Sequence, residues 1–347
     1  MVARMTSRAG AAPVALAVLL MLAGCGGAPA IGDGSSAGAD EEGAVLLPFL
    51  TNRAIEAGSD GKRRYGNTLG ALSGGRCTVV LGEGLRDARV AAVSERPLPA
   101  VLESLTDRGG RPVVVYFHGY YEDFERSCRR AAVFRERLGL TGGFLLFSWP
   151  ANSTPVTYGA DVRDLEASVP VFAEALASIA DRFGRGNISI VAHSLGSRGL
   201  VSALQQAPVS DVRFRDLLLL AADIGRSRFL EALPALRARV GQLTVLVSGR
   251  DRALRLSEAV NRAPRLGQSR DLSAPGIEIR DMSEIADAHL SGHLYHLRNE
   301  RAVDIIREVL FRPTGADRKP VQKAPWAQGH RGTARCKRRQ RARRTRS

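Results

Sequence analysis

The sequence predicts an α/β fold built on a mostly parallel, twisted sheet with helices on both faces. Three observations lead to this prediction. Apolar strand-like runs alternate with helical stretches between residues 112 and 312, a pattern that favours parallel strands joined by helices. One strand leads through a serine-centred turn directly into a helix, and acidic residues follow the ends of others, where an open parallel sheet presents its chemistry. With 347 residues and 44% hydrophobic content, the chain can bury one large core.

Residues 44–111 differ from the rest of the chain. Val45–Phe49 and Cys77–Leu81 have the pattern of short strands, separated by Gly-rich and charged turns. We therefore expect a small antiparallel extension at the edge of the sheet. The later predicted strands are Pro112–Phe117, Phe144–Ser148, Ile188–Ala192, Leu217–Ala221, Leu243–Val247 and Ile277–Arg280, and predicted helices include Asp161–Phe183, Arg198–Gln206 and Leu297–Phe311.

The most informative motif is AHSLG, residues 192–196, which joins the strand Ile188–Ala192 to the helix that follows. A serine at a sharp strand-to-helix turn has its hydroxyl exposed at the end of the sheet. The turn needs small residues two positions before and after the serine, because the strand and helix backbones nearly touch there, and Ala192 and Gly196 meet this need. The sequence therefore predicts Ser194 as a nucleophile, with an ordinary strand-helix turn as the alternative.

A serine nucleophile needs a base and an acid that orients the base, in the chain order Ser, Asp, His. Asp251 follows the strand Leu243–Val247 and is the first choice for the acid, because the histidine loop comes one strand later. Asp223, one strand earlier, is the reserve. His293, in a loop just before a helical run, is the predicted base, and His289 is the fallback. Simpler alternatives stay open, since an aspartate here can be only a helix N-cap and a histidine only a loop residue.

The strand Pro112–Phe117 ends at a loop with the sequence HGYY, residues 118–121. The oxyanion of an acyl-transfer reaction is best stabilised by two fixed backbone amides, one from the residue after the nucleophile and one from such an early loop. Leu195 and Tyr120 are therefore the expected oxyanion donors, and Tyr121 is a further candidate. A simple strand-ending turn is the alternative.

Seven short stretches in a fixed order carry a family resemblance. They are VVVYFHGY (113–120), FSWP (147–150), YGAD (158–161), AHSLG (192–196), AADI (221–224), SGRDRAL (248–254) and GHLY (292–295). Together they resemble the α/β-hydrolase fold and, within it, a bacterial family of largely uncharacterised serine hydrolases. The resemblance covers about residues 45–312, a domain that we expect to span 44–312. It implies a serine hydrolase with Ser194, Asp251 and His293 as its triad, and it implies no particular substrate.

The N-terminus has the pattern of an export signal. Two arginines precede a small and apolar run over residues 11–23, which is too short to span a bilayer comfortably. The tetrapeptide LAGC, which ends at Cys25, then resembles the bacterial lipoprotein signal. The resemblance implies removal of residues 1–24, lipidation of Cys25, a Gly/Ser/Ala-rich tether over 25–43, and anchoring in a membrane of the bacterial cell envelope, facing the periplasm or the exterior. A chance signal-like sequence with an unmodified cysteine is the alternative.

Three further cysteines occur in the chain. Cys77 and Cys128 lie in the predicted domain and can pair in an oxidising compartment if their Cα atoms are within about 7 Å. The sequence leaves this pairing open. Cys336, in the tail, would be left over.

Positive charge is concentrated at the C-terminus. Residues 318–347 contain 12 Lys or Arg and no Asp or Glu, which leaves about +3 of the net +15 for the rest of the chain. Such a run cannot bury apolar surface and repels itself, so we expect residues 313–347 to form a disordered basic tail. An anionic surface of lipid headgroups or envelope polymers is a candidate partner, and nucleic acid is disfavoured because the protein is predicted to be exported.

The sequence therefore predicts a membrane-tethered serine hydrolase that acts on an ester or related acyl bond and uses no metal or organic cofactor. Small-molecule or lipid acyl esters are the expected substrates, cleaved through an acyl-enzyme on Ser194. Two alternatives stay open. One is an acyltransferase, if the site excludes water, and the other is a catalytically silent binding or scaffold protein of the cell envelope.

Overall fold

The computed structural model describes residues 29–32, 43–105, 110–154, 157–206, 213–285 and 291–312. The predicted signal peptide, Cys25, most of the predicted tether, His289 and the basic tail with Cys336 lie outside the described residues. Within the described ranges, none of the helices combines the length and hydrophobicity that crossing a membrane requires.

In this part of the chain, ten strands form one sheet in the order β1-β4-β3-β2-β6-β5-β7-β8-β9-β10. From β2 through β6 to β10 the neighbouring strands are parallel, whereas β2, β3 and β4 pair antiparallel. The strands are β1 (Ile31–Gly32), β2 (Ala44–Ala57), β3 (Arg63–Val80), β4 (Arg89–Glu95), β5 (Val113–Phe117), β6 (Phe144–Ser148), β7 (Ile188–His193), β8 (Phe214–Leu220), β9 (Val240–Val247) and β10 (Glu278–Asp281).

The strand order changes direction at β5. The chain passes from β5 to β6 on one side and then crosses to β7 on the other side of β5, after which β8, β9 and β10 follow outward. Open α/β sheets bind ligands at such a switch point, beyond the carboxyl ends of the strands. The topology therefore places the loops after β5 and β7 next to each other at this edge.

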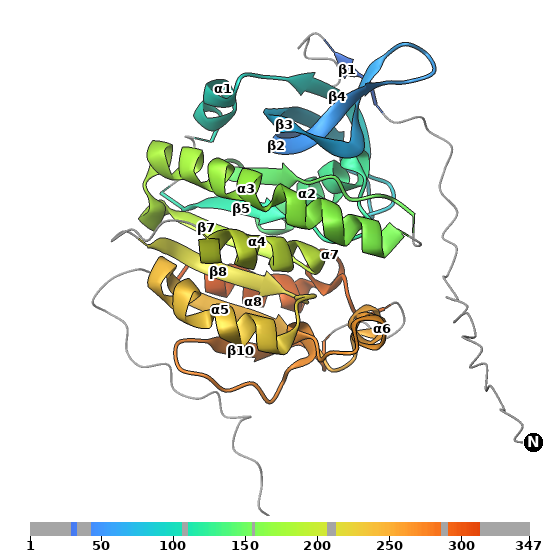
Figure 1. Cartoon of the computed structure of the whole chain (residues 1–347). Helices are drawn as coiled ribbons and strands as arrows, with labels where there is room; N and C mark the ends of the chain where they lie inside the picture. The colour runs from blue at the N-terminus through green and yellow to red at the C-terminus, as the bar shows by residue number, and fades with distance from the viewer. Residues whose placement is uncertain are drawn as a thin grey trace, which may run out of the picture. The chain divides into compact units, whose positions relative to one another are not determined.

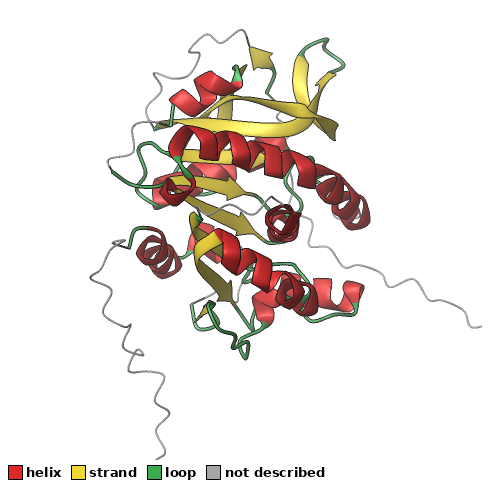
Figure 2. Cartoon of the chain, turned by 60° about the vertical axis from the view of Figure 1, so that its left-hand side comes forward, coloured by secondary structure: helices red, strands yellow, loops and turns green. Residues whose placement is uncertain are grey.

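Helices cover both faces of the sheet (Figures 1 and 2). Apolar side chains of α1, α3, α4 and α5 pack in one core layer, and those of α2, α7 and α8 pack in the other. The helices are α1 (Leu98–Glu103), α2 (Phe124–Arg137), α3 (Tyr158–Phe183), α4 (Leu195–Gln206), α5 (Arg226–Arg239), α6 (Arg252–Asn261), α7 (Tyr295–Arg298) and α8 (Glu300–Leu310), with short 3-10 turns at Arg185–Asn187 and Leu266–Gln268.

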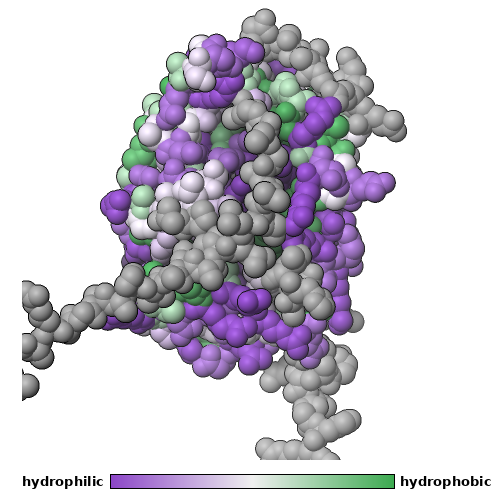
Figure 3. Space-filling view, turned by 90° about the vertical axis from the view of Figure 1, so that its right-hand side faces the viewer, coloured by the Kyte–Doolittle hydropathy of each residue, from purple (hydrophilic) through white to green (hydrophobic). Residues whose placement is uncertain are grey.

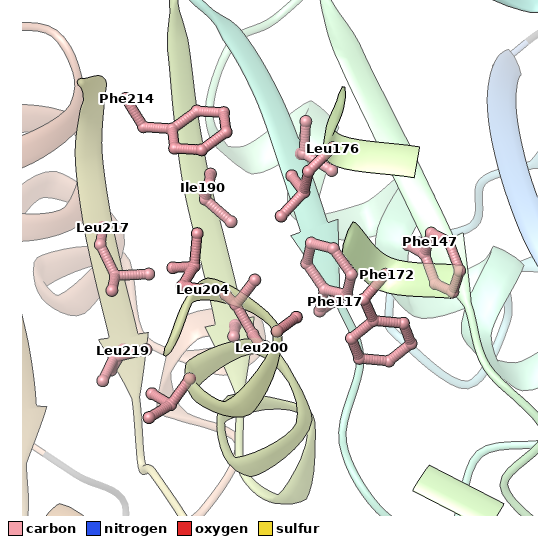
Figure 4. Packing of buried hydrophobic residues seen from close by; sticks show 14 of the residues in the cluster. Phe117, Phe147, Phe172, Leu176, Ile190, Leu200, Leu204, Phe214, Leu217 and Leu219 are labelled. Carbon is pink, nitrogen blue, oxygen red and sulfur yellow. The ribbon is translucent and has the colours of Figure 1, made fainter. Parts of the chain in front are cut away.

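The central strands are buried along their whole length because both faces are covered, as is usual for parallel sheets. Phe117, Phe147 and Phe172 pack together between the sheet and α3, with ring centroids 4.7–5.2 Å apart (Figure 4). Leu200 and Leu204 of α4 lie in the same layer. On the face drawn in Figure 3, hydrophilic side chains predominate among the described residues. The large apolar residues lie between the layers and hold strand and helix together.

The predicted fold class is confirmed, including the antiparallel N-terminal part. Two element predictions are wrong. The N-terminal strands are not short, since β2 and β3 have 14 and 18 residues, and their polar outer halves pair beyond the apolar runs that marked them. The helix predicted over Leu297–Phe311 is interrupted at Asn299, whose side chain accepts a hydrogen bond from the Ala302 amide at 3.1 Å and caps α8.

A disulfide between Cys77 and Cys128 joins β3 to α2, with the Cα atoms 6.4 Å apart. The bond closes a loop over a sequence separation of 51 residues. By the loop-entropy argument, such a closure stabilises the folded state by about 4 kcal/mol, because it restricts the unfolded chain. The antiparallel extension is thus covalently tied to a helix of the parallel part.

Candidate active site

The turn between β7 and α4 holds Ser194 in a strained conformation. Its φ is 51°, in the left-handed region that residues with side chains rarely adopt. A Cβ atom at Gly196 would lie 2.2 Å from the carbonyl oxygen of His118, so only glycine fits at that position. The Ser194 carbonyl accepts hydrogen bonds from the amides of Ser197 at 3.1 Å and Asp223 at 3.0 Å. The local backbone therefore fixes the serine at the carboxyl edge of the sheet.

Three sequence-predicted side chains meet at this edge. His293 Nε2 lies 2.9 Å from Ser194 Oγ, and His293 Nδ1 lies 2.7 Å from Asp251 Oδ2. A carboxylate can only accept, so the His293 Nδ1–H donates to Asp251 and leaves Nε2 free to accept the serine proton. The structure thus brings Ser194, His293 and Asp251 into one hydrogen-bonded chain.

Asp251 serves two neighbours at once. Its Oδ1 accepts from the Leu254 amide at 3.0 Å and caps the N-terminus of α6, while Oδ2 accepts from His293. The carboxylate is fully buried. The helix-cap role and the contact with the histidine are therefore compatible, and the cap holds the carboxylate in the orientation that faces the imidazole.

The pKa of His293 reflects two opposing effects. Burial lowers it, but the negative charge of Asp251 and the hydrogen bond to it raise the pKa, and Asp223 adds to this, so that the net pKa lies above the ordinary value. The ring is still reached by solvent, since 14% of its side chain is exposed. The site can therefore stabilise the imidazolium that forms when the ring takes a proton.

Asp223, the reserve acid, does not contact His293 through a hydrogen bond. Its carboxylate accepts from Ser257 Oγ at 2.5 Å, Tyr158 Oη at 3.0 Å and Arg265 Nη1 at 3.4 Å. These partners come from α6, from α3 and from the segment after α6. Asp223 therefore links elements that surround the site through the hydrogen bonds of its buried carboxylate.

The loop after β5 packs directly against the nucleophile. A Cβ atom at Gly119 would lie 2.9 Å from Ser194 Cβ and 2.7 Å from His193 Nδ1, so the loop backbone approaches as closely as glycine allows. Tyr120 follows Gly119 directly, and Leu195 is the first residue of α4. Tyr121 has a φ of 65°, and its carbonyl accepts from Arg126 at 2.8 Å. Gly119, the residue before Tyr120, thus lies against Ser194, and Leu195 follows Ser194 directly in the chain.

Trp149 directly follows the end of β6. The side chain is fully buried, its ring stacks on that of His118 at 5.2 Å, and its Nε1–H donates to the His118 carbonyl at 2.9 Å. Trp149 therefore belongs to the core and braces the start of the loop after β5.

Arg53, in the second half of β2, is a buried arginine that the sequence patterns do not mark as a site residue. Its guanidinium donates to Ser148 Oγ, to the carbonyls of Gly66, Ala151 and Glu122, and to Asn67 Oδ1, at 2.7–3.2 Å. Burial lowers the pKa of Arg53 to about 9, against the opposing carboxylates Asp123, Glu122 and Asp161, so the group stays charged at neutral pH. Arg53 ties the β2–β3 hairpin to the loops after β5 and β6. Three consecutive polar residues, Thr-Asn-Arg at 51–53, after an apolar strand are the signal that could have identified it.

We expect Arg53→Met to destabilise the fold by about 3–5 kcal/mol, because several buried acceptors lose a charged donor. Denaturant unfolding followed by circular dichroism measures the change. Arg63→Met is the matched control, since Arg63 lies in the same hairpin, is 59% exposed and pairs with Glu95 at 3.1 Å; its loss should change stability by less than about 1 kcal/mol. Equal effects of the two variants would contradict the role given to Arg53.

Among the described residues, no group of three or more His, Cys, Asp or Glu side chains is arranged to hold a metal ion. The polar groups at the carboxyl edge instead form the hydrogen-bonded series from Ser194 to Asp251. This geometry suits transfer of a proton from a hydroxyl to an imidazole that a carboxylate orients.

Comparison with known proteins identifies the family. The family described as alpha/beta hydrolase of unknown function (DUF900) matches residues 98–309. The chain belongs to this family. The match begins with α1 and ends in α8, so that this α/β hydrolase carries Ser194, Asp251 and His293 within the family region, whereas the β2–β3–β4 extension precedes it. No curated protein matches the sequence.

Solved structures are similar to this chain at low identity and low TM-score. The chain is similar to the RedJ thioesterase of the prodiginine biosynthetic pathway of Streptomyces coelicolor (15% identity, 58% of this chain and 87% of that chain, TM-score 0.33). It is also similar to an esterase of Pyrobaculum calidifontis (12% identity, 75% and 84%, TM-score 0.34) and to an acylaminoacyl peptidase of Pyrococcus horikoshii (12% identity, 80% and 44%, TM-score 0.38). At these values the likeness does not bear on the substrate.

Proposed function

We propose that this α/β hydrolase is a serine hydrolase that cleaves an ester or related acyl bond through an acyl-enzyme on Ser194. The observation that carries the proposal is the continuous hydrogen-bonded chain from Ser194 through His293 to Asp251, with distances of 2.9 and 2.7 Å. The strained turn at Ser194 and the close approach of Gly119 support it.

In the proposed reaction, His293 Nε2 takes the Ser194 proton while Oγ forms a bond to the acyl carbonyl carbon. The carbonyl oxygen becomes an oxyanion, which the amides of Tyr120 and Leu195 stabilise. The bond to the leaving group then breaks, and His293 gives the proton to the leaving oxygen. Water, deprotonated by the same imidazole, then attacks the acyl-enzyme; the bond between the acyl carbon and Oγ breaks, His293 returns the proton to Ser194 Oγ, and the acid is released. Asp251 keeps the imidazole in the correct tautomer and stabilises its positive charge.

A fluorophosphonate probe tests the nucleophile directly, because it phosphonylates activated serines only. We expect stoichiometric labelling of the wild-type protein and none of Ser194→Ala. Ser197→Ala is the matched control, since Ser197 lies in the first turn of α4 and its hydroxyl donates to the Ala192 carbonyl at 3.2 Å; it should be labelled like the wild type. Equal labelling of Ser194→Ala would end the assignment.

The raised pKa of His293 sets the direction of the pH dependence. The base must be neutral to take the serine proton, so kcat/KM should fall as the pH falls through this pKa, with a midpoint above about 6.5. Replacing Asp251 by asparagine removes the negative charge that raises the pKa, and the midpoint of the residual activity should move to lower pH. Profiles of kcat/KM against pH for both proteins measure this. A midpoint that is unchanged in the variant would contradict the coupling.

We infer export and lipid anchoring at Cys25 from the LAGC sequence and the apolar run before it. The basic tail over 313–347 is proposed to strengthen attachment to anionic surfaces through its positive charge. Esters within reach of a membrane surface would then be the substrates available to the enzyme.

A further inference from the structure

We propose that His193, the residue before the nucleophile, is a positioning residue that fixes the loop of the base relative to Ser194 and to the loop after β5. The inference rests on the proposed function, because it concerns the placement of the same base. It gives a role to a histidine that does not itself touch the reacting atoms.

The first contact joins His193 to the base. His193 Nε2 lies 3.2 Å from the carbonyl oxygen of His293, and the two rings have centroids 4.7 Å apart. A carbonyl can only accept, so Nε2 carries the proton and donates. On its other side the same loop is held by the Arg252 amide, which donates to the Ser291 carbonyl at 2.8 Å. The base is thus held between the start of α6 and the end of β7.

The second contact joins His193 to the loop after β5. A Cβ atom at Gly119 would lie 2.7 Å from His193 Nδ1 and 3.2 Å from its Cε1, so the ring lies against the glycine backbone. His193 is also the covalent neighbour of Ser194. One imidazole therefore separates the base loop from the proposed oxyanion loop and is attached to the nucleophile.

The ring itself cannot move freely. Only 2% of His193 is exposed, and its ring centroid lies 4.4 Å from that of His296. His296 Nε2 in turn lies 3.3 Å from the hydroxyl of Tyr116 on β5. Burial, followed by the neighbouring histidines His296 and His293, lowers the pKa of His193, so the ring is neutral and carries one N–H.

Stability alone does not account for a histidine at this position. Its Nδ1 is buried and has no hydrogen-bond partner among the described residues. A buried polar atom without a partner is unfavourable, and an apolar ring of similar size would avoid this cost. The imidazole donates a hydrogen bond from Nε2 to the His293 carbonyl, which an apolar ring cannot do.

Two amide variants test whether the side chain at position 193 must reach the His293 carbonyl or need only be polar. In His193→Gln the amide nitrogen can take the place of Nε2, whereas in His193→Asn it is too short to reach the His293 carbonyl. We expect kcat for 4-nitrophenyl butyrate to fall about 10–100-fold in His193→Asn and His193→Phe, with KM within about twofold, because a small misplacement of a catalytic group costs up to about a hundredfold. The loss in His193→Gln should be much smaller: if kcat falls about 100-fold in His193→Asn, it should fall no more than about 10-fold in His193→Gln.

Ser189→Ala is the matched control, since it removes a buried hydrogen bond of the same strand, from Ser189 Oγ to Asp216 Oδ2 at 2.7 Å; its kcat should stay within about twofold of the wild type. Titration with the fluorophosphonate counts active sites, and rates are expressed per titrated site. Thermal unfolding shows which variants are folded, and if His193→Phe does not fold, the Asn and Gln pair decides.

The inference is overturned if His193→Asn keeps wild-type kcat, if His193→Gln and His193→Asn lose the same amount, or if Ser189→Ala loses as much as His193→Asn. Ser194→Ala distinguishes this failure from that of the proposed function. Full activity of Ser194→Ala would remove the proposed function itself. An inactive Ser194→Ala together with an unimpaired His193→Asn would remove only the positioning role.

Discussion

Replacing His293 with alanine is expected to lower kcat for 4-nitrophenyl butyrate about a millionfold, as removal of the base does in enzymes whose serine and histidine act as a unit. The reason is geometric. Nε2 of His293 lies 2.9 Å from Ser194 Oγ, and no other histidine is hydrogen-bonded to that hydroxyl among the described residues. Steady-state rates at a pH above the pKa of His293 measure the loss. Added imidazole should restore a small part of the activity by entering the space left by the ring.

His289→Ala is the control for this experiment, because His289 was the other candidate for the base in the sequence and belongs to the same stretch of chain. It should retain kcat within about threefold. A large loss in His289→Ala together with a small loss in His293→Ala would transfer the role of base to His289 and contradict the assignment.

Much of the fold and of the candidate site could be predicted because both depend on local patterns. The buried parallel strands are short continuous apolar runs, so that Phe144–Ser148 was predicted with its observed bounds and Ile188–Ala192 within one residue. Each residue of the proposed triad then follows the end of a strand. In a parallel sheet all such ends lie at one edge, and the chain order Ser194, Asp251, His293 therefore translated into proximity.

The features that were missed depend on contacts between distant segments. The outer half of the β2–β3 hairpin has few apolar residues to mark it, and Arg53 is buried only because loops from β5 and β6 surround it. The break at Asn299 replaces one expected helix by two, because an asparagine side chain caps the second. No local sequence pattern indicates that His193 contacts the carbonyl of His293, which lies 100 residues later in the chain.

Asp251→Asn is expected to lower kcat about 10,000-fold with little loss of stability. Asparagine can keep one oxygen toward the Leu254 amide, so that α6 stays capped. Its other terminal group is then an NH₂, which cannot accept from His293 Nδ1–H and favours the wrong tautomer of the imidazole. Steady-state kinetics and denaturant unfolding of the same variant measure the two quantities.

Asp223→Asn should behave in the opposite way. Arg265 and Asp223 are both almost completely buried, and the carboxylate has two further hydroxyl donors. Removal of its charge leaves Arg265 without a counterion and should destabilise the fold by about 3 kcal/mol, while kcat per titrated site changes less than about tenfold. If Asp223→Asn lost the turnover and Asp251→Asn only the stability, the roles of the two acids would have to be exchanged. The pair of variants thus separates the aspartate that orients the base from the one that holds the surrounding elements together. The distinction rests on the carboxylate of Asp251, whose Oδ2 lies 2.7 Å from His293 Nδ1.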